Sequence, residues 1–384
     1  MEQKRVYLDC AATMPMTEAA ISAYAECARS GWGNASGLYQ TGRQAKARLE
    51  KARREMAGCM GVLPEEIYFT SGGSESDNWA VKGVMARYRP GEAHLVTTAV
   101  EHPALLNACA FLERQGYDVT YVLPDRFGRV APEDVIAALR PQTRLISVMA
   151  ANNEVGTLEP VAEIASAARA RGILMHTDAV QAISLFPALA KETGADLLSL
   201  SAHKFGGPKG CGALYVRKGV RPEPLIHGGE QERGFRASTE NVPACAAMAA
   251  AFKEAAQNAE RNTALLARLR QMLLDAVLQE VPDAVLNGDP VRHLPGHLHF
   301  SVPGVQDEAL IPLLDLNGVE ASAGSACTAG SYVESHVLRA MGLDGGLLRS
   351  SLRLTFSPEL SEEDALYAAR VIGRTVARLR AAAL

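Results

Sequence analysis

Helical and strand patterns alternate from about residue 40 to residue 216, and this alternation constrains the fold more than any other feature of the sequence. Apolar runs predict strands at 67–70, 94–98, 118–123, 144–150, 173–178 and 196–201. Helical periodicity predicts helices at 43–60, with Gly61 as C-cap, and near 103–115, 132–139 and 161–171. Such alternation indicates βαβ units and therefore an α/β fold with a doubly wound, mostly parallel sheet. Residues 211–216 follow so closely that we expect a strand returning antiparallel beside 196–201.

The 384 residues are too many for one simple core, so we expect two domains. After Pro243 the sequence becomes rich in Ala, Leu, Glu and Arg, which predicts one or two long helices over 244–281. Short strands and helices follow, at 297–302, 307–316, 352–356 and 361–380. We predict a large domain of residues 15–257 and a smaller α+β domain formed by residues 1–14 and 258–384.

Composition and charge exclude several classes of protein. Lys and Arg number 39 against 43 Asp and Glu, which gives no electrostatic footprint for nucleic acid or an anionic membrane. No apolar run approaches the roughly 18 residues of a membrane-spanning helix, and the N-terminus has no apolar signal region. The seven cysteines are scattered without a C-x-x-C pair, which argues against a disulfide framework and a structural zinc site. We expect a cytoplasmic protein with reduced thiols and no metal.

Polar residues follow five different predicted strands. They are Ser71–Ser74, Glu101-His102, Asn152-Asn153, Asp178 and Ser201–Lys204. In an open α/β sheet, ligands bind outside the carboxyl ends of the strands. The sequence therefore predicts that all five segments meet at one edge of one sheet.

Residues 72–77 combine a tight Gly-Gly turn with an [ST]-x-x-[DE] capping signature at the start of a helix. Free N–H groups and the helix dipole make such a start receptive to phosphate. The segment is not a P-loop, because the spacing and the Lys-Ser/Thr pair are absent. Taken alone, a helix cap without a ligand is the better explanation.

Lys204 and Asp178 together suggest pyridoxal phosphate chemistry. Lys204 leaves an apolar run into a glycine-rich turn, where its amine can be desolvated and form a Schiff base. Asp178 closes the apolar run 172–178, where a carboxylate can pair with the protonated nitrogen of a pyridine ring. Each residue is a weak signal, since a lysine after a strand usually faces solvent. The joint order D-A-x-Q, then S-x-H-K-x-x-G-P-K-G, is far more specific.

Three further polar residues each have a structural and a functional interpretation. His102 is either a structural or surface histidine or a group that stacks on a bound ring. Asn153 either shapes a polar turn or bonds a cofactor or substrate through its amide. Arg353 alternates with apolar residues on a predicted strand, so it either faces solvent or points inward to bind a carboxylate.

Cys327 is the best candidate for a nucleophilic thiol. It stands in residues 321–330, a run of small residues, whereas a core cysteine normally has bulky apolar neighbours. Such a setting is typical of a thiol on a mobile loop. Cys211, between two glycines and close to Lys204, is the rival nucleophile. The remaining cysteines lie mainly in helical or apolar surroundings, where inert packing is the default.

Taken together, these motifs resemble the cysteine desulfurases of the class V aminotransferase family, which have pyridoxal phosphate fold type I. The resemblance runs over nearly the whole chain. It rests on residues 7–13, 33–34, 69–78, 98–102, 152–156, 176–181, 201–204, 227–229, 236–239 and 324–328. The last of these segments looks like the first subgroup of the family, whose catalytic cysteine lies on a long flexible loop.

The resemblance implies a role for each candidate residue. Lys204 would form the Schiff base, Asp178 would pair with the pyridine nitrogen and His102 would stack on the ring. The other roles it implies are a bond from Gln181 to the phenolic oxygen; phosphate binding by Gly73, Ser74, Ser201, His203 and, from the other subunit, Thr239; substrate binding by Asn34, Asn153 and Arg353; and sulfur acceptance by Cys327.

The implied reaction converts L-cysteine to L-alanine and leaves a persulfide on Cys327. The resemblance also implies a homodimer and a sulfur-acceptor protein, such as an iron–sulfur scaffold or a tRNA thiolation enzyme. An aminotransferase or selenocysteine lyase of the same fold is the nearest alternative, and transamination needs no thiol at residue 327. A non-catalytic sulfur-transfer or dimerisation subunit is the alternative from another class, and it would have no reason to keep Lys204, Asp178, His102 and Cys327.

Several positions depart from the family's usual pattern. The chain has Asn34-Ala-Ser-Gly and Tyr39 where relatives often carry Asn-Pro-Ser-Ser and a histidine. It has Met14 where a threonine is usual, and Ala323 and Ala329 where serines are common. These departures concern substrate access and leave the lysine, aspartate and cysteine unchanged.

Overall fold

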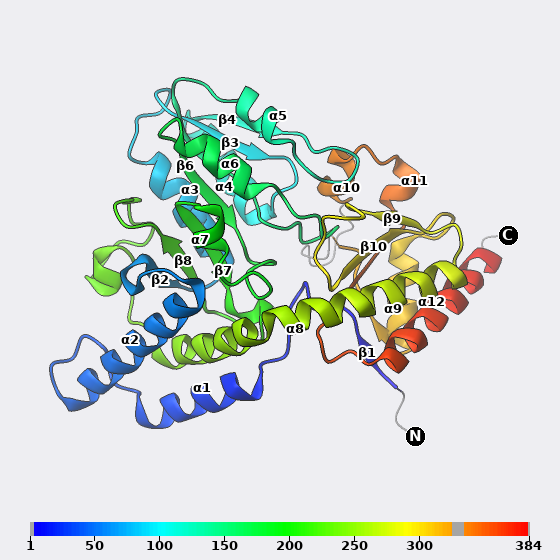
Figure 1. Ribbon diagram of the computed structural model, residues 1–384, viewed down its shortest axis with the longest axis horizontal. Coiled ribbons are helices and arrows are strands. Elements are labelled where there is room, and N and C mark those ends of the chain that lie inside the picture. The colour runs from blue at the N-terminus through cyan, green and yellow to red at the C-terminus, as the bar shows by residue number, and fades with distance from the viewer. Residues whose placement is uncertain (1–3, 325–333, 383–384) are drawn as a thin grey trace.

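A seven-stranded sheet organises the larger part of the molecule (Figure 1), whose computed structural model describes residues 4–324 and 334–382. The strands run in the order β2-β8-β7-β6-β5-β3-β4. Their bounds are β2 Ile67–Thr70, β3 His94–Thr98, β4 Asp118–Val122, β5 Thr143–Ser147, β6 Leu174–Asp178, β7 Leu197–Ser201 and β8 Gly212–Val216. Strands β3 to β7 are mutually parallel, and β8 is antiparallel to both β7 and β2. The predicted α/β class and the antiparallel return of 211–216 are thereby confirmed.

Helices cover both faces of this sheet, which explains why its strands read as continuous apolar runs. Alternate residues of each strand enter different cores: Leu145 packs with helices α3 and α4, whereas its neighbour Ile146 packs with α6 and α8. The helices of this part are α3 Gly73–Met85, α4 Pro103–Arg114, α5 Pro132–Ala137, α6 Val161–Arg169 and α7 Leu189–Thr193. The strand predicted at 144–150 ends at Ser147, although Val148 N and Ala150 N still donate to the β6 carbonyl oxygens of His176 and Asp178 at 3.1 and 2.8 Å.

Three long helices flank the sheet, namely α1 Glu18–Ser30, α2 Gln40–Met60 and α8 Val242–Glu280. Helix α2 ends at Gly61, whose φ of 68° confirms the predicted C-cap. Helix α8 is one continuous helix of 39 residues that runs from the larger part of the molecule to the smaller part (Figure 1). Helix α1 was not among the helices predicted from the sequence.

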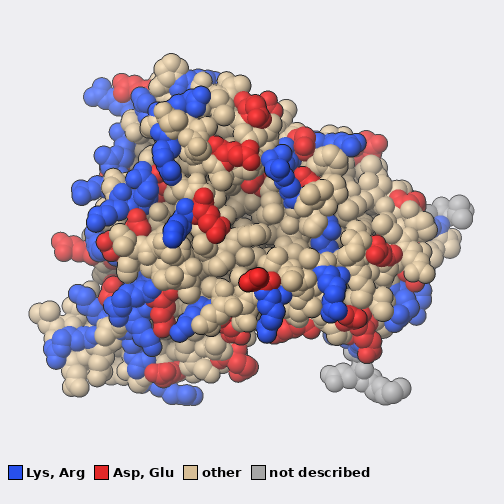
Figure 2. Space-filling model, in the orientation of Figure 1, with Lys and Arg blue, Asp and Glu red and all other residues tan. Residues whose placement is uncertain are grey.

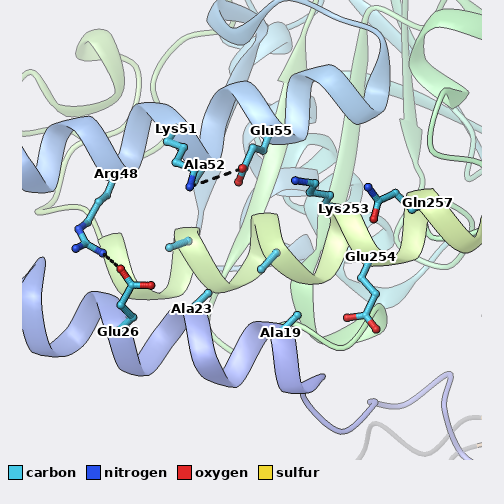
Figure 3. Close-up of a pocket in the computed structure, with 12 residues that line it drawn as sticks. Ala19, Ala23, Glu26, Arg48, Lys51, Ala52, Glu55, Lys253, Glu254 and Gln257 are labelled. Atoms are coloured by element: carbon cyan, nitrogen blue, oxygen red, sulfur yellow. Dashed lines mark hydrogen bonds and ion pairs between the residues drawn. The ribbon is translucent and has the colours of Figure 1, made fainter.

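A cavity of about 520 Å³ lies between α1, α2 and α8 (Figure 3). Its floor is formed by alanines, and its rim carries ion pairs such as Arg48 Nη1 to Glu26 Oε1 at 3.1 Å. The described residues that line it are alanine, glutamate, lysine, arginine and glutamine. None of the residues that the sequence predicts to bind cofactor or substrate is among those that line this cavity.

The smaller part has a second core around a three-stranded antiparallel sheet of order β12-β10-β9. Its elements are β9 Val285–Asn287, β10 His297–Ser301, α9 Asp307–Leu316, β11 Val319–Glu320, α10 His336–Ala340, α11 Gly345–Leu348, β12 Ser351–Thr355 and α12 Glu362–Ala382. The N-terminal strand β1, Val6–Tyr7, pairs parallel with β11, and Leu8 joins the same core. Residues 6–8 thus pack with the last third of the chain.

Positive and negative side chains are interspersed over the face shown in Figure 2. This distribution agrees with the formal net charge of −4. Among the helices within 4–324 and 334–382, none combines the length and the apolar character needed to cross a bilayer.

Candidate active site

The five polar segments that follow β2, β3, β5, β6 and β7 lie at one edge of the large sheet, as predicted. These strands all point the same way, because β8 is antiparallel to both β2 and β7. A cavity of about 510 Å³ opens at this edge. Its lining comprises Ala12, Thr13, Ser71, Gly72, Gly73, Ser74, Glu75, Ser201, His203, Lys209 and Gly210. The structure therefore brings together four predicted phosphate-binding residues, Gly73, Ser74, Ser201 and His203.

The predicted capping signature at residues 72–77 is wrong in detail. Helix α3 begins at Gly73, and its N-cap is Gly72, which has no side chain to cap the first N–H groups. Gly72 has a φ of 155°, and a Cβ on Gly212 would approach its Cα at 2.6 Å, so only a glycine pair fits this crossing. Glu75 accepts a hydrogen bond from Ser71 N at 2.8 Å and pairs with Arg236. The uncapped helix start faces the cavity, which suits a phosphate group.

Lys204 follows β7 in a short 3₁₀ turn, Ala202–Lys204, and its amine meets the N-terminal segment of the chain. Its Nζ donates to the carbonyl oxygen of Ala12 at 2.9 Å and to that of Ala11. Gln181 Nε2 donates to the same Ala11 carbonyl at 3.0 Å. The ring Nδ1 of His203 lies 3.1 Å from Thr13 Oγ1. Three predicted site residues are therefore tied to the segment that links β1 to α1.

Asp178 ends β6 and is buried, with Oδ1 accepting from Val180 N at 2.9 Å. Burial raises the pKa of its carboxyl, whereas the Val180 N–H and the charge of Lys204 lower it. Asp77 on α3 is also buried, and its Oδ1 has no hydrogen-bond partner among the described residues. Burial raises the pKa of Asp77 well above its usual range, and the charge of Asp178 adds to this effect. Two buried carboxyls of this kind favour a positively charged ligand, so the site fits the protonated ring nitrogen of pyridoxal phosphate.

His102 is both a helix cap and a neighbour of Lys204. It is the N-cap of α4, and its Nδ1 accepts a hydrogen bond from Ala104 N at 3.1 Å. Burial, with the charges of Lys204 and His336, lowers the pKa of His102 to about 4. The imidazole is therefore neutral at physiological pH, with its proton on Nε2. The structural interpretation of His102 is correct as far as the cap is concerned.

Arg353 points inward from β12 and is buried, which decides between the two orientations predicted for it. Its Nη2 forms an ion pair with Asp9 Oδ1 at 2.7 Å. Its Nη1 donates to the carbonyl oxygen of Asn153 at 2.9 Å. A buried guanidinium beside the sheet edge can bind a carboxylate bidentately. Asp9 was not among the predicted site residues, because its role as the partner of Arg353 depends on a contact across 344 positions.

Two predicted site residues, Asn34 and Thr239, form no described contact with the residues of this edge. Asn34 lies on the loop between α1 and α2, at the end of the molecule remote from the smaller part (Figure 1), where its Oδ1 accepts from Ser36 N. Thr239 is exposed. Cys327 lies outside the described residues. Cys211, the rival thiol, is buried and contacts Met248 Sδ at 3.5 Å, which agrees with inert packing.

Comparison with known proteins places the chain in a family. The model of the class V aminotransferase family matches residues 6–365. The cysteine desulfurase IscS of Methanosarcina thermophila is 42% identical over 99% of this chain and 94% of its own length. A solved NifS-like protein matches with a TM-score of 0.91 at 34% identity, over 97% of this chain and 100% of that one. A structure described as SspA in complex with cysteine matches with a TM-score of 0.81 at 33% identity, over 92% and 99%. The chain therefore belongs to the class V aminotransferase family and, within it, to the cysteine desulfurases.

Proposed function

We propose that this chain converts L-cysteine to L-alanine with pyridoxal phosphate, the cofactor of its family, and receives the sulfur as a persulfide on Cys327. One observation carries the proposal: the Lys204 amine, the uncapped start of α3 and the buried Asp178 carboxyl occupy the same edge of the sheet. The match to a protein solved with cysteine supports cysteine as the substrate. The sulfur then passes to an acceptor protein, such as an iron–sulfur scaffold or a tRNA thiolation enzyme.

The cofactor would be held by residues of the large sheet edge. The N–H groups at Gly73 and Ser74, with Ser201 and His203, bind its phosphate. The Asp178 carboxylate keeps the ring nitrogen protonated, the neutral His102 ring stacks on the ring face, and Gln181 bonds the phenolic oxygen. The cofactor, when bound, supplies an electron sink for the electron pair of the substrate Cα–H bond.

The remaining residues would handle the substrate. Arg353 binds the carboxylate of L-cysteine with help from Asn153, while Asp9 keeps the guanidinium oriented from the other side. Lys204, once exchanged for the substrate amine, takes the Cα proton. The Cys327 thiolate attacks the substrate sulfur, so that an S–S bond forms as the Cβ–S bond breaks. The electron pair left at Cβ would take up a proton, with His102 involved in the transfer, Lys204 would return a proton to Cα, and L-alanine would leave.

A spectrum with product analysis tests this function. We expect the purified holoenzyme to show a yellow absorption band that changes when L-cysteine is added. We also expect L-alanine and, with a reductant, sulfide in equal amounts. Formation of a 2-oxo acid without sulfide would favour the aminotransferase alternative instead.

We also propose a cytoplasmic homodimer, with domains of residues 15–257 and of 1–14 with 258–384. The loop that carries Asn34 exposes Trp32 by 70%, Leu38 by 89% and Tyr39 by 61%, an apolar surface that a second copy can cover. Thr239 is exposed, so it can reach the phosphate of the partner's cofactor. In such a dimer, Asn34 and Thr239 each act in the active site of the other subunit.

Sedimentation velocity of the holoenzyme should give the mass of a dimer. Replacing Trp32 and Leu38 by serine should weaken the dimer and lower cofactor affinity together, because each site loses groups from the partner. An active monomer would contradict both the homodimer and the role of Thr239.

A further inference from the structure

The chain on either side of residues 325–333 converges on one buried side chain, that of Glu154. Gly324, with a φ of +94°, lies so close that a Cβ there would be 3.6 Å from Glu154 Oε2 and 3.2 Å from His299 Nε2. On the far side, the Ser335 hydroxyl donates a hydrogen bond to Glu154 Oε2. The same hydroxyl accepts from Leu338 N at 3.0 Å and so caps α10. Glu154 is therefore bonded to Ser335, on one side of the segment that contains Cys327, and lies beside Gly324, on the other side.

The backbone of Glu154 is fixed independently of these contacts. Its N–H donates to Asn152 Oδ1 at 2.8 Å, and its carbonyl oxygen lies 2.8 Å from His297 Nε2. The residue is 3% exposed, and His336 Nδ1 lies 4.0 Å from its Oε1. The backbone of Glu154 already has hydrogen-bond partners, so the turn does not need the side chain. The buried carboxyl group is therefore available to bond the neighbouring segments.

The same turn also contacts the proposed substrate arginine. Arg353 Nη1 donates to the carbonyl oxygen of Asn153, one residue before Glu154, and also to that of Gly324 at 3.3 Å. Arg353 and Ser322 exchange backbone hydrogen bonds beside it. The 152–154 turn is therefore bonded both to the substrate arginine and to Ser335, and Arg353 in turn is bonded to Gly324.

We propose that Glu154 is a positioning residue for sulfur transfer: its bond to Ser335 keeps that residue beside Gly324 and so sets the spacing of the two chain ends between which Cys327 lies. The inference rests on the proposed role of Cys327. Its chemical requirement is an acceptor for the Ser335 hydroxyl, which a glutamine can also supply through its carbonyl oxygen. Removing that acceptor leaves the lysine, the aspartate and the phosphate site untouched, because they lie on other strands of the edge.

Two readouts separate positioning from a general structural role. The first is the single-turnover rate of persulfide formation on Cys327, followed by mass spectrometry. The second is exchange of the Cα proton of saturating L-alanine in D₂O, which requires Lys204 but no thiol. Misplacing a reacting group by about 1 Å can cost about 100-fold in rate. We therefore expect Glu154→Ala to slow persulfide formation by about 10- to 100-fold and to leave Cα exchange within about threefold of wild type.

Two further variants and one control distinguish the outcomes by the same two measurements. Glu154→Gln should recover most of the persulfide rate, and Ser335→Ala should lose rate in the same direction as Glu154→Ala. Glu159→Gln is the control, because Glu159 is also buried and accepts from Val130 N at 3.0 Å, but forms no described contact with Gly324 or Ser335. It should change neither readout by more than about twofold.

Wild-type persulfide formation in Glu154→Ala, or an equal loss in both readouts, would overturn the inference. The cofactor spectrum and the melting temperature establish whether Glu154→Ala is folded. If it is not, Ser335→Ala decides, since it removes the same hydrogen bond and keeps the carboxylate, and a normal persulfide rate there would contradict the inference. Sulfide release by Cys327→Ser would instead refute the proposed function itself, so the two failures are distinguishable.

Discussion

Replacing Lys204 by alanine should lower L-cysteine turnover by at least about 1,000-fold while the fold persists. The amine serves twice in the proposed reaction, as the group that bonds the cofactor and as the base for the Cα proton, and general bases alone contribute about 100- to 10,000-fold. Its side chain lies at the edge of the sheet rather than in a core, so the loss should hardly change the melting temperature. Alanine production from L-cysteine, measured at saturating pyridoxal phosphate, checks the prediction.

Lys209→Ala is the matched control for this variant. Lys209 lines the cavity at this sheet edge and is a lysine like Lys204, but it is exposed and follows Lys204 by five residues. We expect it to weaken cofactor binding a few-fold and to keep the reaction. Near wild-type turnover in Lys204→Ala would contradict the role of Lys204 as Schiff-base lysine and base, whatever the activity of Lys209→Ala.

Cys327→Ser should bind the cofactor and respond spectrally to L-cysteine, yet form neither persulfide nor sulfide. The reason is that a serine hydroxyl cannot attack the substrate sulfur, whereas the steps at Lys204 and Asp178 need no thiol. After cysteine treatment of the wild type, mass spectrometry should find the extra sulfur on the peptide that contains Cys327.

Cys211→Ser provides the comparison and should keep most activity. Cys211 is 2% exposed and contacts Met248, so its thiol cannot reach a substrate without opening the core. Extra sulfur on Cys211, together with an active Cys327→Ser, would reverse the assignment of the nucleophile.

The part of the site at the carboxyl ends of the strands could be predicted, because the sequence patterns that indicate it are local. Each polar segment follows its own apolar run, and the D-A-x-Q and S-x-H-K motifs lie within single strand-to-turn segments, so periodicity and order are enough. The start of α3 was mispredicted for the opposite reason. Ser and Asp in 74–77 satisfy a capping pattern, but the close crossing of Gly72 and Gly212 fixes where the helix begins, and the two lie 140 positions apart in the chain.

The pairing of Arg353 with Asp9 and the convergence on Glu154 could not be predicted from local patterns. Both join the smaller part of the molecule to segments that are distant in the chain, at separations of 344 and 181 positions. A single strand pattern leaves an arginine free to face either way, and only the packing of β12 against the N-terminal segment decides its direction. The loop that carries Asn34 poses a further difficulty, since its proposed partner belongs to another subunit.

Helix α8 has a consequence for how the molecule resists unfolding. Its 39 residues span about 58 Å, and its first third packs in the core under the large sheet while its last third packs in the core of the smaller part. Unfolding either core alone would expose one end of a helix whose other end is still packed, which raises the free energy of unfolding that core by itself. We therefore expect the two parts to unfold in one cooperative transition. A destabilising change in one core, such as Phe252→Ala, should then also destabilise the other core, which carries Arg353.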